Sequence, residues 1–243
     1  MNFTYKSYEE LIDKLHAQGY AFSSYSNWKE TSKCVIMRHD IDYDIEKACR
    51  LALLEKQKQI VSTYFVLVTS DFYNIFSARN TELLHVISSC GHEIGLHFDE
   101  IRYPDLQTID ELRDKIIQES MILSIVTGHS VDVVSMHRPS QMMLDSNLTI
   151  PGIINSYGDV FFKEFKYVSD SRRRWREPIE EIIASKEYNR LHILTHAFWY
   201  NNYEMDIHDS VCLFINNGNK QRYINMKSNI KELHTIMVES EIE

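Results

Sequence analysis

Acidic and imidazole side chains follow several apolar runs of this chain. The segment Arg38 to Asp42 reads RHDID and comes directly after the apolar run Cys34 to Met37. Three later apolar runs are followed in the same way by His97, His137 and His196. Carboxylates and imidazoles together suit a borderline divalent cation such as zinc. Beside such an ion, a free carboxylate can accept a proton from water and a histidine can protonate a leaving group. The set predicts metal-dependent hydrolysis of an amide or an ester.

Each of these side chains also has a simpler explanation when it is taken alone. The chain has 11 histidines, and a lone histidine is more often a hydrogen-bonded structural residue than a ligand. An aspartate after a strand is often the N-cap of the next helix, and we expect this of Asp44. The recurrence of Asp, His or Arg at several strand ends favours a metal or acid–base site over these explanations.

The elements that must position these side chains follow a regular alternation. Short runs rich in β-branched and aromatic residues predict strands, at 34–37, 61–68, 93–96, 131–136, 153–154, 167–168 and 191–195. Helical patterns lie between them, at 44–57, 81–89, 109–126 and 178–185. A capping box from Ser7 to Glu10 is expected to open a first helix, and the tail from Asp209 on is mostly helical in pattern. Strands alternating with helices predict an α/β fold with a parallel sheet. Active sites of such folds collect at the carboxyl ends of the strands.

Composition narrows the class of protein. The chain has 243 residues, 44% of them hydrophobic, which suits one large α/β domain. Its formal net charge of −9 disfavours binding to nucleic acid. No run approaches the roughly 18 apolar residues of a membrane span, and the N-terminus lacks the pattern of a signal peptide. The scattered cysteines are expected to be reduced thiols, at positions 34, 49, 90 and 212. We therefore expect a cytoplasmic protein without a membrane span.

Six short motifs occur in an order that is typical of one family. They are HDID at 39–42, TYFV at 63–66, GHEIGLH at 91–97, Arg138-Pro139, SDS at 169–171 followed by Trp175, and LTH at 194–196. In this order the chain resembles the polysaccharide deacetylases of the NodB-homology group, from about residue 34 to about residue 200. The resemblance implies a distorted (β/α) barrel with about seven parallel strands. It predicts a single catalytic domain over 1–243, with a helical extension over about 208–243.

The resemblance also implies roles for particular residues. Asp40 would be the general base and Asp42 a metal ligand, with His97 as a second ligand. His196 would be the general acid. Arg138 would orient the base, as the arginine near a proline does in the family.

The resemblance also implies residues that surround the predicted acid, His196. Asp170 and Trp175 fall where the family has an Asp and a Trp that pack against or tune that histidine. Trp199 follows His196 and, like Tyr200, either stacks on a sugar ring or packs in the core.

The chain departs from the family at two places. Ile41 separates the two aspartates, which are adjacent in the family. Ile101 stands where the family has its second metal-binding histidine. His137 is the predicted third ligand in its place, with Asp99 and His92 as weaker alternatives. His137 also stands two residues before Pro139 and is alternatively the counterpart of the family's arginine.

The predicted function is removal of an acyl group, chiefly N-acetyl, from a sugar or sugar precursor in surface polysaccharide biosynthesis. A divalent metal, with zinc preferred, is the predicted cofactor. The run Arg172 to Arg174, with Arg176, is either a solvated loop or a site that attracts a phosphate- or nucleotide-linked sugar. Two rival functions remain: a non-catalytic barrel that binds a glycan or a partner enzyme, and a deformylase-like hydrolase of another C–N bond.

Overall fold

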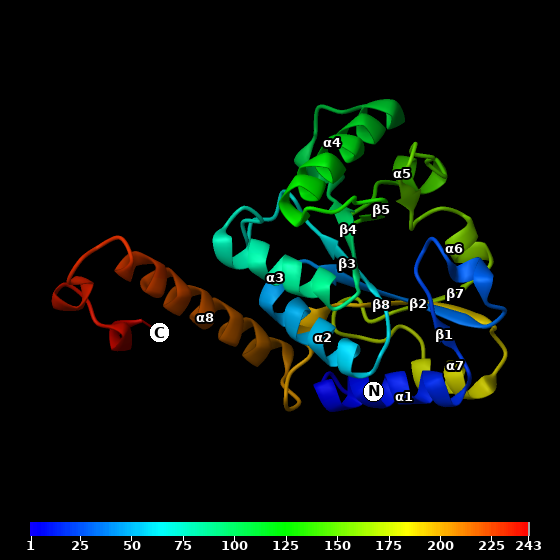
Figure 1. The fold of residues 1–243 in the computed structure, drawn as a ribbon, viewed down its shortest axis with the longest axis horizontal. Coiled ribbons are helices and arrows are strands. Elements are labelled where there is room, and N and C mark those ends of the chain that lie inside the picture. Colours follow the sequence, from blue (N-terminus) through cyan, green and yellow to red (C-terminus); the bar gives the residue numbers. More distant parts are fainter. Residues whose placement is uncertain (243) are drawn as a thin grey trace. The chain divides into compact units, whose positions relative to one another are not determined.

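The computed structural model describes residues 1–242 and divides the chain into two compact units, one over residues 1–202 and one from residue 203 on (Figure 1). The first unit contains a parallel sheet whose strands are β1 (Ala21–Phe22), β2 (Cys34–Ile41), β3 (Thr63–Val66), β4 (Glu93–Phe98), β5 (Val133–Met136), β6 (Ile154–Asn155), β7 (Lys166–Ser169) and β8 (Arg190–Thr195). Its strand order is β6-β5-β4-β3-β2-β8-β7, and β1 pairs with β2 beside this path. The seven strands of the path confirm the predicted α/β fold of distorted-barrel type.

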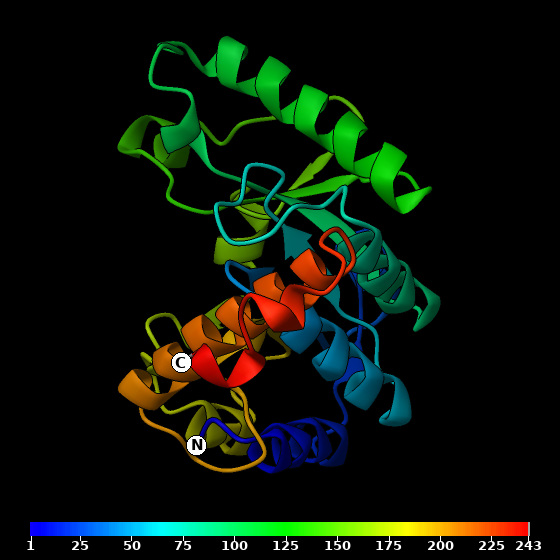
Figure 2. The ribbon, with the colours of Figure 1, turned by 90° about the vertical axis from the view of Figure 1, so that its left-hand side faces the viewer.

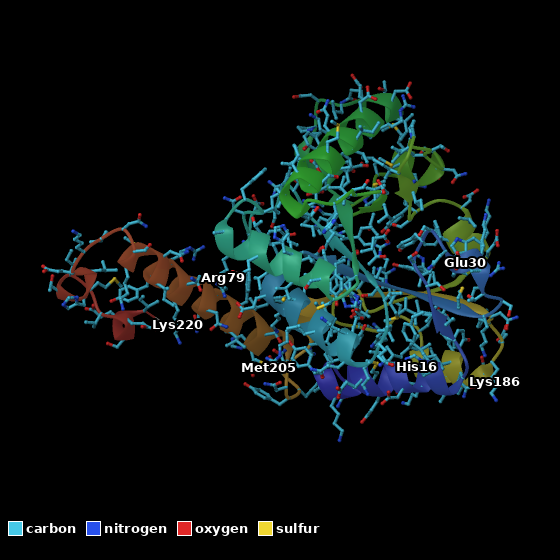
Figure 3. The ribbon with its side chains drawn as sticks, in the orientation of Figure 1. His16, Glu30, Arg79, Lys186, Met205 and Lys220 are labelled. Atoms are coloured by element: carbon cyan, nitrogen blue, oxygen red, sulfur yellow. The ribbon has the colours of Figure 1, made fainter. Side chains whose placement is uncertain are left out.

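Helices connect the strands and cover the sheet. In the first unit they are α1 (Tyr5–Ala17), α2 (Ile45–Gln57), α3 (Ala78–Ser89), α4 (Ile109–Thr127), α5 (Gln141–Asp145), α6 (Val160–Lys163) and α7 (Ile179–Ser185). Helix α2 packs against α3 and α3 against α4, so these three follow one another around the sheet (Figure 2). Helix α1 contacts β1 through His16, whose ring centroid lies 4.9 Å from that of Phe22 (Figure 3). Helix α7 ends at Ser185, and the next residue, Lys186, has the left-handed backbone angle φ 58°.

The second unit is helical, as the tail pattern predicted. Its main element is α8 (Ile207–Lys227), and the side chain of its N-cap residue Asp206 accepts a hydrogen bond from the backbone N–H of Asp209. A 3₁₀ turn, Leu233–Thr235, follows it. Within residues 1–242, no helix is both long enough and apolar enough to cross a membrane.

Local signals explain most element boundaries, and two expectations were wrong. Asp44 caps α2 as expected, because its carboxylate accepts from the N–H groups of Glu46 and Lys47. The capping box predicted at Ser7 does not form: Thr4 is the N-cap of α1 and accepts from the Ser7 N–H. Strand β2 does not stop at Met37 but continues through Ile41, so the charged cluster is part of the strand.

The outer face of β2 carries a buried polar network that ties three elements together. Glu55 of α2 has no exposed surface and accepts hydrogen bonds from the hydroxyls of Tyr8, Ser62 and Tyr64 at 2.5, 2.6 and 2.7 Å. The Nε2 of His39 lies 2.9 Å from the same carboxylate. Burial alone would raise the pKa of Glu55, but His39 and the hydroxyl donors outweigh burial and lower it to about 2. The network keeps α1, α2 and β3 fixed to the strand that carries Asp40.

Inside the sheet, one glycine is required by close packing. A Cβ at Gly95 of β4 would lie 2.5 Å from the ring of Phe65 on β3 and 3.0 Å from Val133 on β5. The Phe65 ring in turn lies 4.9 Å from the Arg38 guanidinium. The glycine of the GHEIGLH motif therefore makes room for the aromatic ring that supports Arg38.

Candidate metal and acid–base site

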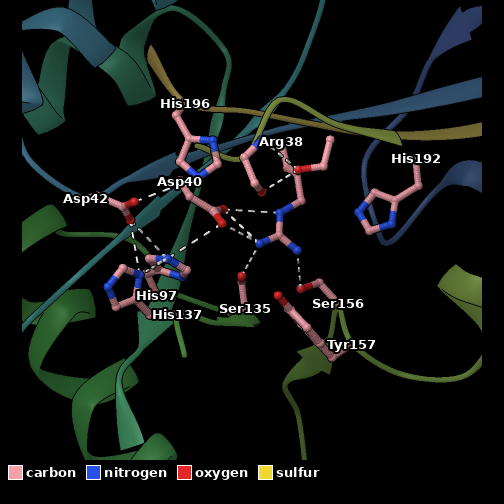
Figure 4. A network of polar contacts seen from close by, with 12 residues as sticks. Arg38, Asp40, Asp42, His97, Ser135, His137, Ser156, Tyr157, His192 and His196 are labelled. Atoms are coloured by element: carbon pink, nitrogen blue, oxygen red, sulfur yellow. Dashed lines mark hydrogen bonds and ion pairs between the residues drawn. The ribbon is translucent and has the colours of Figure 1, made fainter. Parts of the chain in front are cut away.

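Strand alternation on β2 decides which side chains reach the inside of the curled sheet. Side chains two residues apart on a strand share a face. Arg38 and Asp40 therefore point inward, while His39 points outward to the Glu55 network. Asp42 follows the end of the strand and lies at the carboxyl edge of the sheet, beside Asp40 (Figure 4).

Three side chains meet at this edge. The Oδ1 atom of Asp42 lies 3.3 Å from Nε2 of His97 and 3.2 Å from Nδ1 of His137. The two imidazole nitrogens lie 3.1 Å apart (Figure 4). His97 comes from β4, and His137 directly follows β5, which pairs with β4. The three residues predicted as metal ligands are thus brought together by separate segments of the chain.

The triangle of donor atoms fits a divalent cation. Donors bound at 2.0–2.2 Å to a tetrahedral ion lie about 3.3 Å apart, close to the three edges observed. Asp42 Oδ1 is buried and, within the described residues, has no hydrogen-bond partner. A buried carboxylate oxygen is rarely left unsatisfied without a reason. A cation would satisfy that oxygen and both imidazole nitrogens at once.

Charge supports the same reading of Asp42. Burial alone would raise the pKa of this carboxyl group, but His137 and His97 outweigh burial and hold the pKa well below its usual value. The group is therefore a carboxylate at any pH near neutrality, which is the form that binds a metal.

Asp40 is held by Arg38, to which the sequence analysis assigned no role of its own. The Arg38 side chain is fully buried, and its Nη2 donates to both carboxylate oxygens of Asp40 at 2.8 and 2.7 Å. It also donates to Ser135 and Ser156 (Figure 4). Burial would raise the pKa of Asp40, yet Arg38 reverses this and lowers it. Asp40 therefore stays ionised at neutral pH.

The role assigned to Arg138 must be corrected. Its guanidinium donates to both oxygens of Asp99, with Nε 3.2 Å from Oδ1, and half of its side-chain surface is exposed. Arg38 occupies the position on Asp40 that was predicted for Arg138. The spacing Arg38-x-Asp40 was a usable signal, because it places both side chains on one face of a strand.

His196 lies on the other side of Asp42 and is oriented by Asp170. Its Nδ1 is 2.6 Å from Oδ1 of Asp170, whose other oxygen accepts from the His196 backbone N–H at 3.1 Å. The Nε2 atom faces Oδ2 of Asp42 at 3.8 Å. Burial lowers the pKa of His196, but Asp170, Asp42 and Asp40 outweigh burial and raise it to about 9. A protonated imidazole is the form that a general acid requires.

The remaining predicted residues lie around this centre. Trp175 and Trp199 are partly buried and pack against the main core, so their contact with a substrate stays a prediction. Asp99, a weaker ligand candidate, is paired with Arg138 and lies outside the triangle. His92 belongs to the outer network, where it contacts Ser62 and the carbonyl of Ala52.

Comparison with known proteins supports the fold. No family model and no curated sequence matches the chain. A CE4 esterase from Streptococcus mutans is 16% identical, with a TM-score of 0.52 over 87% of this chain and 91% of that chain. A chitin deacetylase from Colletotrichum lindemuthianum is 14% identical, with a TM-score of 0.47 over 76% and 81%. A CE4 family pseudoenzyme from Bacillus anthracis is 15% identical, with a TM-score of 0.45 over 79% of this chain. This chain spans 62% of that pseudoenzyme.

At this identity, the likeness to the streptococcal esterase shows a shared fold. The curled parallel sheet of this chain therefore has the fold of that CE4 esterase. The resemblance found in the motifs is therefore confirmed at the level of the fold, in a divergent chain.

Proposed function

We propose that the chain is a metal-dependent deacylase that removes an acyl group, chiefly N-acetyl, from a sugar. One arrangement carries the proposal. Asp42, His97 and His137 form a cation-sized triangle, with Asp40 beside it and the His196–Asp170 pair facing the other oxygen of Asp42. A base, a metal site and an acid within one cluster match the requirements of acyl hydrolysis.

The residues of the chain divide the chemistry between them. Asp42, His97 and His137 would hold a divalent ion such as zinc, which supplies a Lewis acid for the acyl carbonyl. The Asp40 carboxylate, fixed by Arg38, accepts the proton of the attacking water. His196 Nε2 donates a proton to the departing nitrogen or oxygen of the sugar. Asp170 holds His196 Nδ1, so that Nε2 carries the transferable proton toward the site.

The arginine cluster that follows Asp170 supports a proposal for the class of substrate. Asp170 is followed by the arginine cluster, in which Arg172, Arg174 and Arg176 are exposed. Guanidinium groups bind phosphate oxygens in pairs of hydrogen bonds. We infer a phosphate- or nucleotide-linked sugar as the substrate. In the double variant Arg172→Ala/Arg174→Ala, KM should rise for a nucleotide-linked acetamido sugar and stay unchanged for the neutral sugar. An equal KM for both in wild type would contradict this inference.

Metal content and turnover test the proposal together. After zinc loading and removal of free ion, wild type should retain about one ion per chain, while Asp42→Ala and His97→Ala should lose it. Asp40→Asn should keep the ion and lose about 10²- to 10⁴-fold in turnover of acetylated amino sugars. Asp13→Asn, an exposed carboxylate on α1, is the matched control.

Four outcomes would contradict the proposal. Wild type without stoichiometric metal, or Asp40→Asn with full turnover, removes the mechanism. Glycan binding without release of acetate points instead to a non-catalytic barrel. Release of formate from formylated amino sugars, with acetylated ones left intact, points to a deformylase-like enzyme.

A further inference from the structure

The third ligand of the triangle comes from an unusual position, and the structure shows what holds it there. His137 lies just beyond the end of β5, on a segment that leaves the sheet. Residues 137–140 are joined to residues 98–100 by three consecutive links. The His137 N–H donates to the Phe98 carbonyl at 2.8 Å. The Arg138 guanidinium donates to the Asp99 carboxylate. The Ser140 N–H donates to Glu100 Oε1 at 2.9 Å. The loops after β4 and β5 are thus connected along their length.

The middle link is a contact between two charged side chains. Asp99 is only 2% exposed, and both of its oxygens accept from Arg138. Such a forked arginine–carboxylate contact fixes direction as well as distance. A second arginine, Arg102, lies 3.7 Å from the same carboxylate and pairs with Asp71. Asp99 is therefore a rigid anchor, whereas the opposite part of Arg138 faces solvent.

We propose that the Asp99–Arg138 pair is a positioning pair that holds His137 against His97 and Asp42, so that β5 can supply the third metal ligand. Asp99 is two residues from His97, and Arg138 is the neighbour of His137. The pair therefore fixes the distance between the facing nitrogens of the two imidazoles, Nε2 of His97 and Nδ1 of His137, which are 3.1 Å apart. The segment after β4 includes Ile101, whose aliphatic side chain cannot bind a metal, so the third ligand comes from the segment after β5. The inference rests on the proposed metal site, and it gives Arg138 a role that does not involve Asp40.

Zinc affinity, measured by competition with a chromophoric chelator, tests the pair without any substrate. Arg138→Ala and Asp99→Asn should each weaken zinc binding about 10- to 100-fold, as loss of groups that orient metal ligands generally does. The visible spectrum of the Co²⁺-loaded protein should lose intensity, because the ligand geometry is no longer enforced. Arg138→Lys, which keeps the charge, should restore part of the affinity. The matched control is Glu164→Gln, which breaks an exposed bond to Arg190 at the opposite end of β8.

A second background separates positioning from a general structural effect. In His137→Ala, the ligand that the pair positions is gone, so adding Arg138→Ala should change zinc affinity by less than about twofold. An equal loss in both backgrounds would overturn the proposal, and so would unchanged affinity of Arg138→Ala in the wild-type background. Urea unfolding of the zinc-free proteins shows that each variant is folded. If wild type binds no zinc, the proposed metal site and the proposed function are both wrong. If wild type binds zinc and Arg138→Ala binds it equally well, only the positioning role is wrong.

Discussion

The buried pair of Arg38 and Asp40 gives the sharpest test of the structure. Arg38→Met leaves the Asp40 carboxylate, which is 5% exposed, without its arginine partner, and the Nε2 atom of His97 lies 3.6 Å away. Asp40→Leu leaves a guanidinium with no exposed surface and no carboxylate partner. Breaking a buried ion pair from either side costs about 3–5 kcal/mol, because an uncompensated charge remains. Total stabilities of domains are about 5–15 kcal/mol, so each single variant should still fold but unfold at a lower urea concentration.

The double variant decides whether this account is correct. Replacing both charges by apolar side chains removes the desolvation cost, so Arg38→Met/Asp40→Leu should lie within about 2 kcal/mol of wild type. The assay is urea unfolding by circular dichroism in the presence of a chelator, which removes any contribution from metal. For Arg38→Met the loss should shrink as the pH falls from 7 toward 4, because the isolated Asp40 carboxyl group can take up a proton. Additive losses in the double variant would refute the reasoning.

Three further predictions concern buried positions in the sheet and in its helices. Gly95→Ala should cost about 1–3 kcal/mol, because its methyl group meets the Phe65 ring, and urea unfolding measures the loss. Burial raises the pKa of Glu119 to about 7, so its contribution to the free energy of unfolding is present below pH 4.5 and is lost as the pH rises through 7. Between pH 4.5 and pH 8, the stability of Glu119→Gln should therefore increase by about 3 kcal/mol relative to that of wild type. A difference that does not depend on pH would contradict this. The pKa of Glu55 is lowered to about 2, so its contribution to the free energy of unfolding is present above pH 4.5 and is lost as the pH falls through 2. In the same assay, the stability that wild type loses over this pH range should be about 3 kcal/mol larger than the stability that Glu55→Gln loses.

The sequence predicted the sheet and most of the site because both leave local signals. The strand ends at His97, His137 and His196 follow apolar runs, and parallel strands bring such ends to one edge. The position of Arg38 was missed for a physical reason. Charged residues are almost never fully buried unless they are paired, so the cluster was expected to lie beyond the strand. Only the strand register and the contacts of Arg38 with Ser135 on β5 and with Ser156, which follows β6, show that the pair is inside.

The role of Arg138 was wrong for a related reason. The family pattern assigns a function to an arginine near a proline, but a pattern does not show which carboxylate the arginine meets. Asp99 and Asp40 are both acidic residues near strand ends, and only the packing of the β4 and β5 loops selects between them. Long-range contacts of this kind have no signature in a single sequence.

The three donors of the triangle lie tens of residues apart on three segments, which makes the proposed ion a cross-link in the folded chain. An unfolded chain would have to close two long loops to bind the same ion, so the ion would favour the native state. At a free zinc concentration of 1,000 times Kd the gain would be about 4 kcal/mol. Zinc should therefore raise the melting temperature, and chelation should make the protein easier to degrade. Resistance to a protease, compared with and without zinc, would then report an intact site before any substrate is known.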